Sequence, residues 1–172
     1  MQPVAEFSVT ARPDRRIVEV YDADAYLGDE QAMATSRQQV VAGNGYHLYI
    51  HTLQPDIRVH ITIRLWDTPP PPPAEAEGHA PITLDSETGI LVVNQLTLGP
   101  AGEMTLPEPG VYEGTAWWAS RQAAADYYNL TLQEIEEDWS PERVTQAWAD
   151  CPTPEHYILD LSYIRPSPDD DE

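Results

Sequence analysis

The chain has 172 residues and a formal net charge of −20 at neutral pH, because 29 acidic residues face only nine basic ones, all of them arginine. Such a charge repels the phosphates of nucleic acids and argues against direct binding of DNA or RNA. It favours rapid encounter with a basic protein partner, with simple solubility as the alternative explanation of the acidity.

Composition also limits the class of protein. The 17 prolines favour short segments over long helices. No apolar run approaches the roughly 18 residues of a membrane span, and residues 1–6 lack the features of a secretory signal, so we expect a cytoplasmic protein without membrane contact. The single Cys151 excludes an internal disulfide and a cysteine-based zinc site, and we expect a structural thiol in a loop.

The N-terminal quarter contains two short segments in which apolar and polar side chains alternate. This is the period of a half-buried strand. It predicts strands at residues 6–10 and 17–21 around a turn, followed by an acidic loop at 21–30.

Three antiparallel strands are predicted next, at residues 39–42, 46–52 and 57–67. Asn44-Gly45 is a strong hairpin signal between the first two. Pro55-Asp56 is a turn sequence, so the second and third strands are also expected to form a hairpin.

Five consecutive prolines, Pro69 to Pro73, interrupt the alternation. Proline-rich chain adopts an extended conformation that cannot join the interior of a sheet. We expect a stiff connection between two sheets, with a ligand for an SH3-like domain as the alternative.

The alternation resumes after the prolines and predicts further strands at residues 82–85, 89–98, 103–106, 110–120, 127–133 and 156–164. About nine to eleven strands at this spacing are typical of an antiparallel, jelly-roll-like β-sandwich. We therefore expect a mainly β fold, with one domain over residues 1–165 and a disordered acidic tail at 166–172.

One short helix is predicted within the sandwich, near residues 140–149. Ser140 is a favourable N-cap residue and Pro141 suits the first helical position. Trp139 precedes the cap and is expected to pack on Val144 as a hydrophobic staple.

Motifs that would indicate catalysis or a cofactor are absent from the sequence: it has no glycine-rich phosphate loop, nucleophile elbow, HExxH helix or EF-hand loop. The best metal candidates are His47, His51 and His60. On one strand the Cα atoms of His47 and His51 would be roughly 13 Å apart, too far to share one zinc ion easily. We therefore predict neither a catalytic residue, a cofactor nor a metal site.

Two surfaces are candidates for partner binding. The first is the acidic connection around the predicted helix start, with Glu134, Glu136, Glu137, Asp138, Trp139 and Glu142. Carboxylates beside an aromatic anchor suit a basic groove in a partner, and a solvated helix face is the alternative.

The second candidate surface is one face of the predicted hairpin, with His47, Tyr49, His51, Arg58, His60, Arg64 and Trp66. Tyr, Trp and Arg are frequent in interface hot spots, and ordinary packing under loops is the alternative.

Two segments carry a family resemblance. Leu106-Pro107-Glu108-Pro109-Gly110-Val111-Tyr112 is a proline–glycine turn leading into a strand, and residues 155–161 form the predicted last strand. Together they resemble small bacterial β-sandwich nuclease inhibitors of the competence protein J type. The resemblance covers about the last 60 residues and the general strand spacing, and the helix at 140–149 and the proline run depart from it. It implies a protein that binds and inhibits a nuclease or toxin, and it transfers no individual site residue.

The function predicted from these observations is that of a non-enzymatic inhibitor or immunity-like protein that binds a basic protein partner. The alternative is a structural or accessory subunit of a larger assembly, which would use the second surface. A third possibility is an enzyme or small-ligand carrier with a cavity in the sandwich. The sequence leaves the oligomeric state open.

Overall fold

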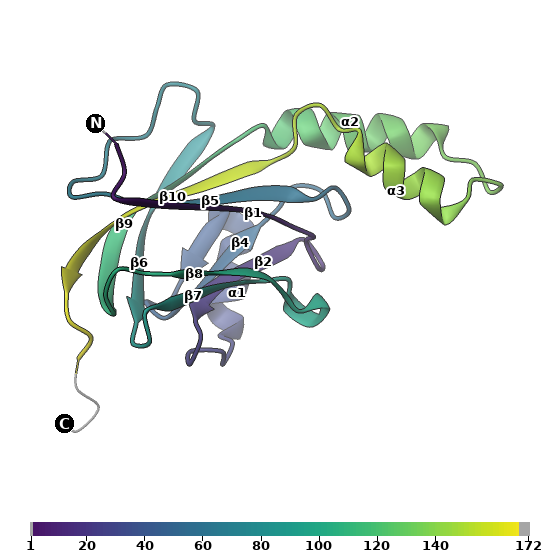
Figure 1. The fold of residues 1–172 in the computed structure, drawn as a ribbon. Coiled ribbons are helices and arrows are strands. Elements are labelled where there is room, and N and C mark those ends of the chain that lie inside the picture. Colours follow the sequence, from purple (N-terminus) through teal and green to yellow (C-terminus); the bar gives the residue numbers. More distant parts are fainter. Residues whose placement is uncertain (1, 169–172) are drawn as a thin grey trace.

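The computed structural model describes residues 2–168, in which ten strands form two packed five-stranded sheets (Figure 1). The first, here called the β10 sheet, has the spatial order β1 (Ala5–Ala11), β5 (Val59–Leu65), β10 (His156–Arg165), β9 (Gly110–Ala119) and β6 (Gly78–Ser86). The second, the β2 sheet, has the order β3 (Val41–Gly43), β4 (His47–His51), β2 (Ile17–Asp22), β7 (Ile90–Asn94) and β8 (Pro100–Thr105). The predicted mainly β sandwich is confirmed.

Alternating side chains of both sheets meet in one core. Ile61 and Ile63 of β5 and Leu159 of β10 point inward and are fully buried, and they face Val20 and Val93 of the β2 sheet. Burial of each such side chain stabilises the fold by roughly 1.5–3 kcal/mol. All pairs are antiparallel except β5 with β10, which run parallel.

The predicted hairpin between residues 46–52 and 57–67 is wrong. The two strands belong to different sheets: β4 pairs with β2 and β3, whereas β5 pairs with β1 and β10. Residues 52–58, here called the crossover, carry the chain from one sheet to the other. Turn residues such as Pro55 and Asp56 suit a crossover as well as a hairpin, so the local signal could not separate them. The antiparallel pairing of β3 with β4 is confirmed.

The proline-rich segment does not connect two sheets. It joins β5 to β6 within the β10 sheet and must pass β10 and β9 to do so. At the end of this segment the backbone N–H of Glu77 donates to the carbonyl of Trp118 in β9, one residue before β6 begins.

Three α-helices accompany the sheets in the described part of the chain, and only the last was predicted. They are α1 (Glu30–Gln39), α2 (Arg121–Glu134) and α3 (Pro141–Ala149), and a 3₁₀ turn covers Leu96–Leu98. Asp29 caps α1, because its carboxylate accepts from the backbone of Gln31 and Ala32 at 3.0 Å. No helix within residues 2–168 is long and apolar enough to cross a membrane.

The strand predicted at 127–133 is wrong because this segment is the second half of α2. Three alanines near the start of α2 favour a helix, and the helix buries Ala124, Ala125 and Thr131. Leu130 and Leu132, which suggested a strand face, are 63% and 45% exposed. Residues 169–172 of the predicted tail lie outside the described residues.

Candidate protein-binding site at the helical hairpin

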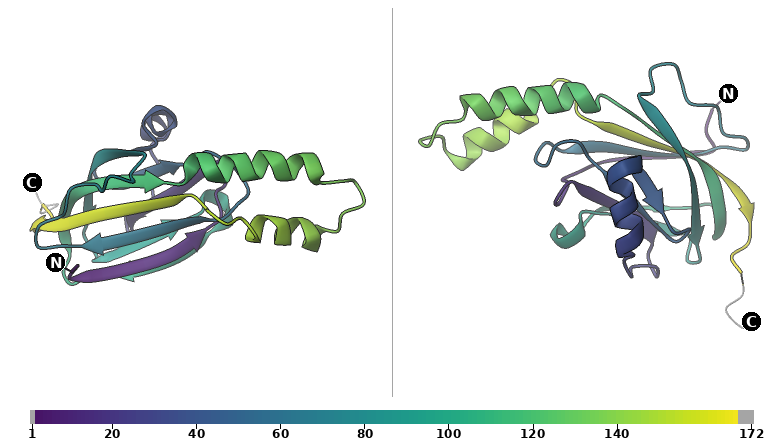
Figure 2. Two further views of the ribbon diagram at one scale, coloured as in Figure 1. Left: turned by 90° about the horizontal axis from the view of Figure 1, so that it is seen from above. Right: turned by 180° about the vertical axis from the view of Figure 1, so that it is seen from behind.

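Helices α2 and α3 form a helical hairpin, residues 121–149, that is inserted between β9 and β10. The ribbon views show it projecting past the end of both sheets (Figures 1 and 2). Ser140 caps α3, since its hydroxyl accepts from the backbone of Arg143 at 3.1 Å, and Pro141 follows at the first position. The predicted helix start is confirmed.

A buried carboxylate holds the base of the hairpin against the crossover. Glu155 is fully buried and accepts from the backbone N–H of Leu53 at 2.8 Å and from the side chain of Gln54 at 3.0 Å. It also accepts from the hydroxyl of Tyr157 and lies 3.7 Å from the guanidinium of Arg121, the first residue of α2. Both ends of the insertion are thereby tied to one carboxylate.

Above this base, the two helices share a small apolar cluster with the crossover. Ile57 and Cys151 are buried there, and Trp148 stacks on Tyr128 with ring centroids 4.9 Å apart. The hydroxyl of Tyr128 donates to Asp56 at 3.0 Å. Burial raises the pKa of the Cys151 thiol, which agrees with a structural role, and its loop position before β10 is confirmed.

The residues of the predicted acidic surface lie at the far end of the hairpin, here called the tip (residues 134–142). Glu134 ends α2, the connection carries Glu136, Glu137 and Asp138, and Glu142 lies in the first turn of α3. All five carboxylates are exposed, and none has a side-chain hydrogen bond or ion pair within residues 2–168. Arg143 lies over the ring of the half-buried Trp139, 3.8 Å from its centroid.

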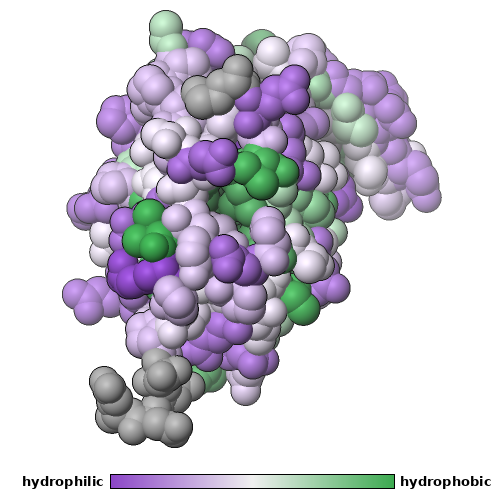
Figure 3. Space-filling model, turned by 60° about the vertical axis from the view of Figure 1, so that its left-hand side comes forward, coloured by the Kyte–Doolittle hydropathy of each residue, from purple (hydrophilic) through white to green (hydrophobic). Residues whose placement is uncertain are grey.

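The face of the tip is therefore unusually anionic. The space-filling view shows the projecting end of the molecule, at the upper right, covered largely by hydrophilic residues (Figure 3). Exposed carboxylates without a side-chain partner among the described residues are available to a partner protein. Such groups raise association rates with a basic surface.

The second predicted surface does not exist as one face, because its residues divide between the two sheets. His47 and Tyr49 are buried on the outer side of the β2 sheet beside α1, where their rings stack 4.7 Å apart. His47 contacts the carboxylate of Glu19 through Nε2. His47 and Tyr49 are therefore ordinary packing residues, which was the alternative to a binding surface in the sequence analysis.

His51 ends β4 of the β2 sheet, and the other four members lie on or beside the outer face of the β10 sheet. His60, Arg64 and Trp66 share one face of β5 and its end, and Arg58 lies at the groove described below. Asp160 of the neighbouring strand accepts from the guanidinium of Arg64 and from the indole of Trp66, both at 2.8 Å. Alternation along β10 gives no sign of these partners of Asp160, because they lie on other strands.

Within the described part of the chain, no group of three His, Cys, Asp or Glu side chains is placed to hold a metal ion. His51 ends β4, whereas His60 lies in β5 of the other sheet. The histidines considered from the sequence are therefore not brought together.

Two histidines are expected to make stability depend on pH. Burial, together with Arg121, Arg16 and Arg37, lowers the pKa of His51, and burial, together with His60 and Arg64, lowers that of His156. Just below the ordinary histidine pKa of about 6.5, the unfolded chain thus binds more protons than the folded chain. The contribution of these two histidines to the free energy of unfolding is fully present above that pH. It is lost as the pH drops from there through their lower pKa values in the folded state.

Urea unfolding at about pH 7.5 and pH 5.5 measures this pH dependence. The double variant His51→Gln/His156→Gln should show a smaller loss on acidification than the unaltered chain. His79→Gln, at an exposed histidine, is the matched control and should leave the loss unchanged. An equal loss in the double variant would contradict the assignment.

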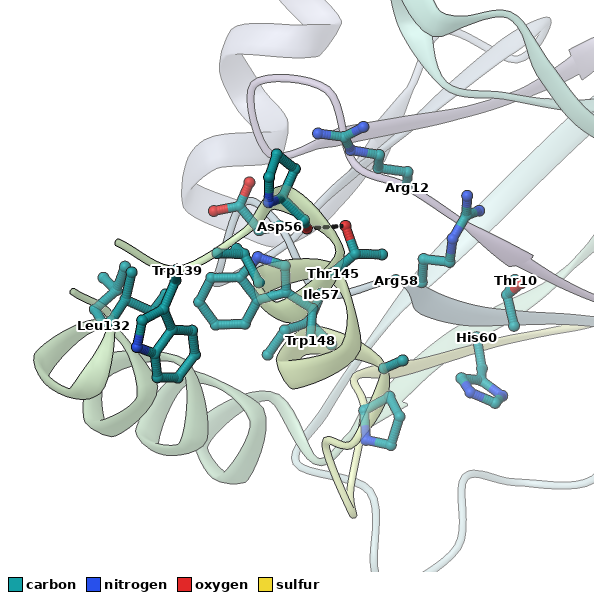
Figure 4. Close-up of a pocket in the computed structure, with 15 residues that line it drawn as sticks. Thr10, Arg12, Asp56, Ile57, Arg58, His60, Leu132, Trp139, Thr145 and Trp148 are labelled. Carbon is teal, nitrogen blue, oxygen red and sulfur yellow. Dashed lines mark hydrogen bonds between the residues drawn. The ribbon is translucent and has the colours of Figure 1, made fainter. Parts of the chain in front are cut away.

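A groove of about 820 Å³ lies between the hairpin and the end of the β10 sheet (Figure 4). The hairpin lines it with Leu132, Ile135, Trp139, Val144 and Trp148, and the sandwich lines it with Thr10, Arg12, Arg58 and His60. Sequence reasoning missed this groove, because its walls come from segments that are distant in the chain.

Comparison with known proteins yields structural likeness only. No protein-family model and no curated protein sequence matches the chain. The fold is similar to that of ComJ from Bacillus subtilis, described as an inhibitor of the DNA degrading activity of NucA, with a TM-score of 0.59 and 12% identity. That match covers 95% of this chain and 98% of ComJ.

A second solved structure, described as crocagin biosynthetic gene J, matches with a TM-score of 0.54 and 14% identity over 94% of this chain and 100% of its own. At these sequence identities the likeness shows a similar fold and nothing more. The predicted resemblance to β-sandwich proteins of the competence protein J type is thereby confirmed at the level of structure.

Proposed function

We propose that this protein is a non-enzymatic inhibitor or immunity-like protein that binds a basic protein partner, such as a nuclease or toxin, through the acidic tip. The observation that carries the proposal is the placement of five exposed carboxylates, free of side-chain partners within residues 2–168, at the end of a projecting hairpin. Carboxylates in such an array can occupy the sites where a basic protein holds phosphates.

The fold supports this proposal. ComJ, which has a similar fold, is described as a nuclease inhibitor. In this chain the base of the hairpin is held by a buried carboxylate, so the tip is presented on a fixed support and loses little conformational freedom on binding. A structural or accessory role in an assembly has less support, since the surface predicted for it divides between the two sheets.

The tip is tested by charge reversal. Changing Glu136, Glu137 and Asp138 together to Lys should weaken partner binding by about a hundredfold, or about 2.7 kcal/mol, because three attractive contacts become repulsive. The tagged protein is used as bait in cells of its own source, retained proteins are identified by quantitative mass spectrometry, and binding of the purified partner is measured by calorimetry. We expect a basic protein that the variant fails to retain.

The matched control reverses Glu75, Glu103 and Glu108, which are exposed and lie outside the hairpin. It makes the same change in net charge and should keep the partner. Association of the unaltered protein should also slow as salt is raised, since salt screens exposed charges. Equal retention by the tip variant would disprove the proposal, as would equal losses in both triple variants.

A further inference from the structure

The groove beneath the hairpin has two chemically different walls. Its hairpin wall is apolar and aromatic, with Trp139, Val144 and Trp148. Its sandwich wall is basic, with Arg12 directly after β1 and Arg58 directly before β5. In the close-up the two arginine side chains come from neighbouring segments and extend in different directions, that of Arg12 to the left and that of Arg58 upward (Figure 4).

The two arginines are notable because this chain has a large excess of acid. Within residues 2–168 neither guanidinium makes a hydrogen bond or an ion pair. The backbone N–H of Arg12 donates to the side chain of Gln95 at 2.6 Å, which fixes the start of its side chain. Asp56, the carboxylate that lines the same groove, accepts from the hydroxyl of Tyr128 on the hairpin. Asp56 in the groove and Asp14, which interacts electrostatically with Arg12, offset part of the positive charge, but neither guanidinium is engaged in a direct contact within residues 2–168.

The size of the groove suits part of a polypeptide. Its volume of about 820 Å³ lies within the range of about 300–1,000 Å³ that is usual for ligand sites. Aromatic and aliphatic side chains on one wall provide anchoring contacts, and guanidinium groups on the other pair with carboxylates in a bidentate manner.

We propose that this groove binds a short acidic peptide segment that carries large apolar side chains, with its carboxylates at Arg12 and Arg58 and its apolar groups against Val144 and Trp148. Arginine beside tryptophan would also suit a single-stranded nucleic acid. The net charge of −20 and the carboxylates of the adjacent tip oppose a polyphosphate far more than a segment with one or two charges. The groove is a second binding site beyond the acidic tip, and it recognises the opposite charge.

A displayed library of random peptides, selected on the purified full-length protein, tests the groove directly. Enriched peptides should combine Asp or Glu with large apolar residues. The double variant Arg12→Glu/Arg58→Glu should bind the enriched peptides at least tenfold more weakly and should itself enrich Lys or Arg. Both positions are exposed, so the fold is expected to persist, which thermal unfolding checks.

The matched control, Arg37→Glu/Arg165→Glu, makes the same charge change at exposed arginines away from the groove and should bind the peptides normally. The lysine variant of the tip should bind the peptides at least as tightly as the unaltered protein, because it replaces nearby negative charge with positive charge. Failure of the groove and failure of the tip therefore give different results. Absence of enrichment, enrichment of peptides without acidic residues, or tighter binding of random single-stranded DNA that depends on Arg12 and Arg58 would each overturn the proposal.

Discussion

Replacing Glu155 by glutamine should lower the free energy of unfolding by about 3 kcal/mol, although the two side chains have nearly the same shape. Every group that approaches this carboxylate is a donor: two backbone N–H groups, the amide of Gln54, the hydroxyl of Tyr157 and, at 3.7 Å, the guanidinium of Arg121. Burial and the Glu155 carboxylate raise the pKa of Tyr157 well above its ordinary value, so the phenol keeps its proton. A glutamine NH₂ would face these donors and leave at least one unsatisfied.

Urea denaturation measures the loss, and hydrogen exchange shows where it acts. We expect faster exchange in α2 and α3 than in the central strands, because Glu155 holds both ends of the hairpin to the crossover. Glu137→Gln, at an exposed position on the tip, is the isosteric control and should leave stability unchanged. Equal stability of Glu155→Gln and the control would show that the carboxylate is dispensable.

Much of the sandwich could be predicted from side-chain alternation. In β5 and β10 every inward position is aliphatic or aromatic over the whole strand, and both strands were predicted close to their observed bounds. What alternation does not encode is the partner of a strand. β4 and β5 are separated by only seven residues, yet they lie in opposite sheets. The crossover between them is held by hydrogen bonds from Leu53 and Gln54 to Glu155, a residue about a hundred positions later.

The helical hairpin shows a different limit. Its second helix was predicted because Ser140 and Pro141 form a local start signal. Its first helix begins after Ser120, which has a left-handed backbone and makes no capping hydrogen bond. Without a start signal, the spacing of Tyr128, Leu130 and Leu132 resembled a strand, although both leucines are exposed in the helix.

The two proposed binding sites also differ in how far the sequence could reveal them. The acidic tip is contiguous in sequence, so its residues could be identified before the fold was known. The groove joins residues near positions 12, 58 and 148, which only the crossover and the hairpin bring together. Arg58 was grouped from the sequence with His47 and His51, which the fold places in the other sheet, as well as with His60, which lines the same groove.

Replacing Asp160 by asparagine should also destabilise the fold by about 3 kcal/mol. The carboxylate is 1% exposed and accepts four N–H bonds at 2.8–3.1 Å, two from Arg64 and one each from the indoles of Trp66 and Trp117. These donors come from β5, its end and β9, so Asp160 links the outer surfaces of three neighbouring strands. The NH₂ of asparagine would oppose one donor pair and remove the charge that Arg64 faces.

Chemical denaturation gives the magnitude, and near-ultraviolet circular dichroism reports the surroundings of the two indoles. Glu113→Gln is the control, because Glu113 lies on the same sheet in an exposed ion pair with Arg165 at 3.9 Å and such pairs contribute little. The same variants separate a structural surface from a binding surface. If Asp160→Asn loses stability but still binds the partner with unchanged affinity when folded, Arg64 and Trp66 serve the sheet. If affinity falls while Glu113→Gln retains it, the outer face of the β10 sheet contacts the partner, and the acidic tip is insufficient by itself.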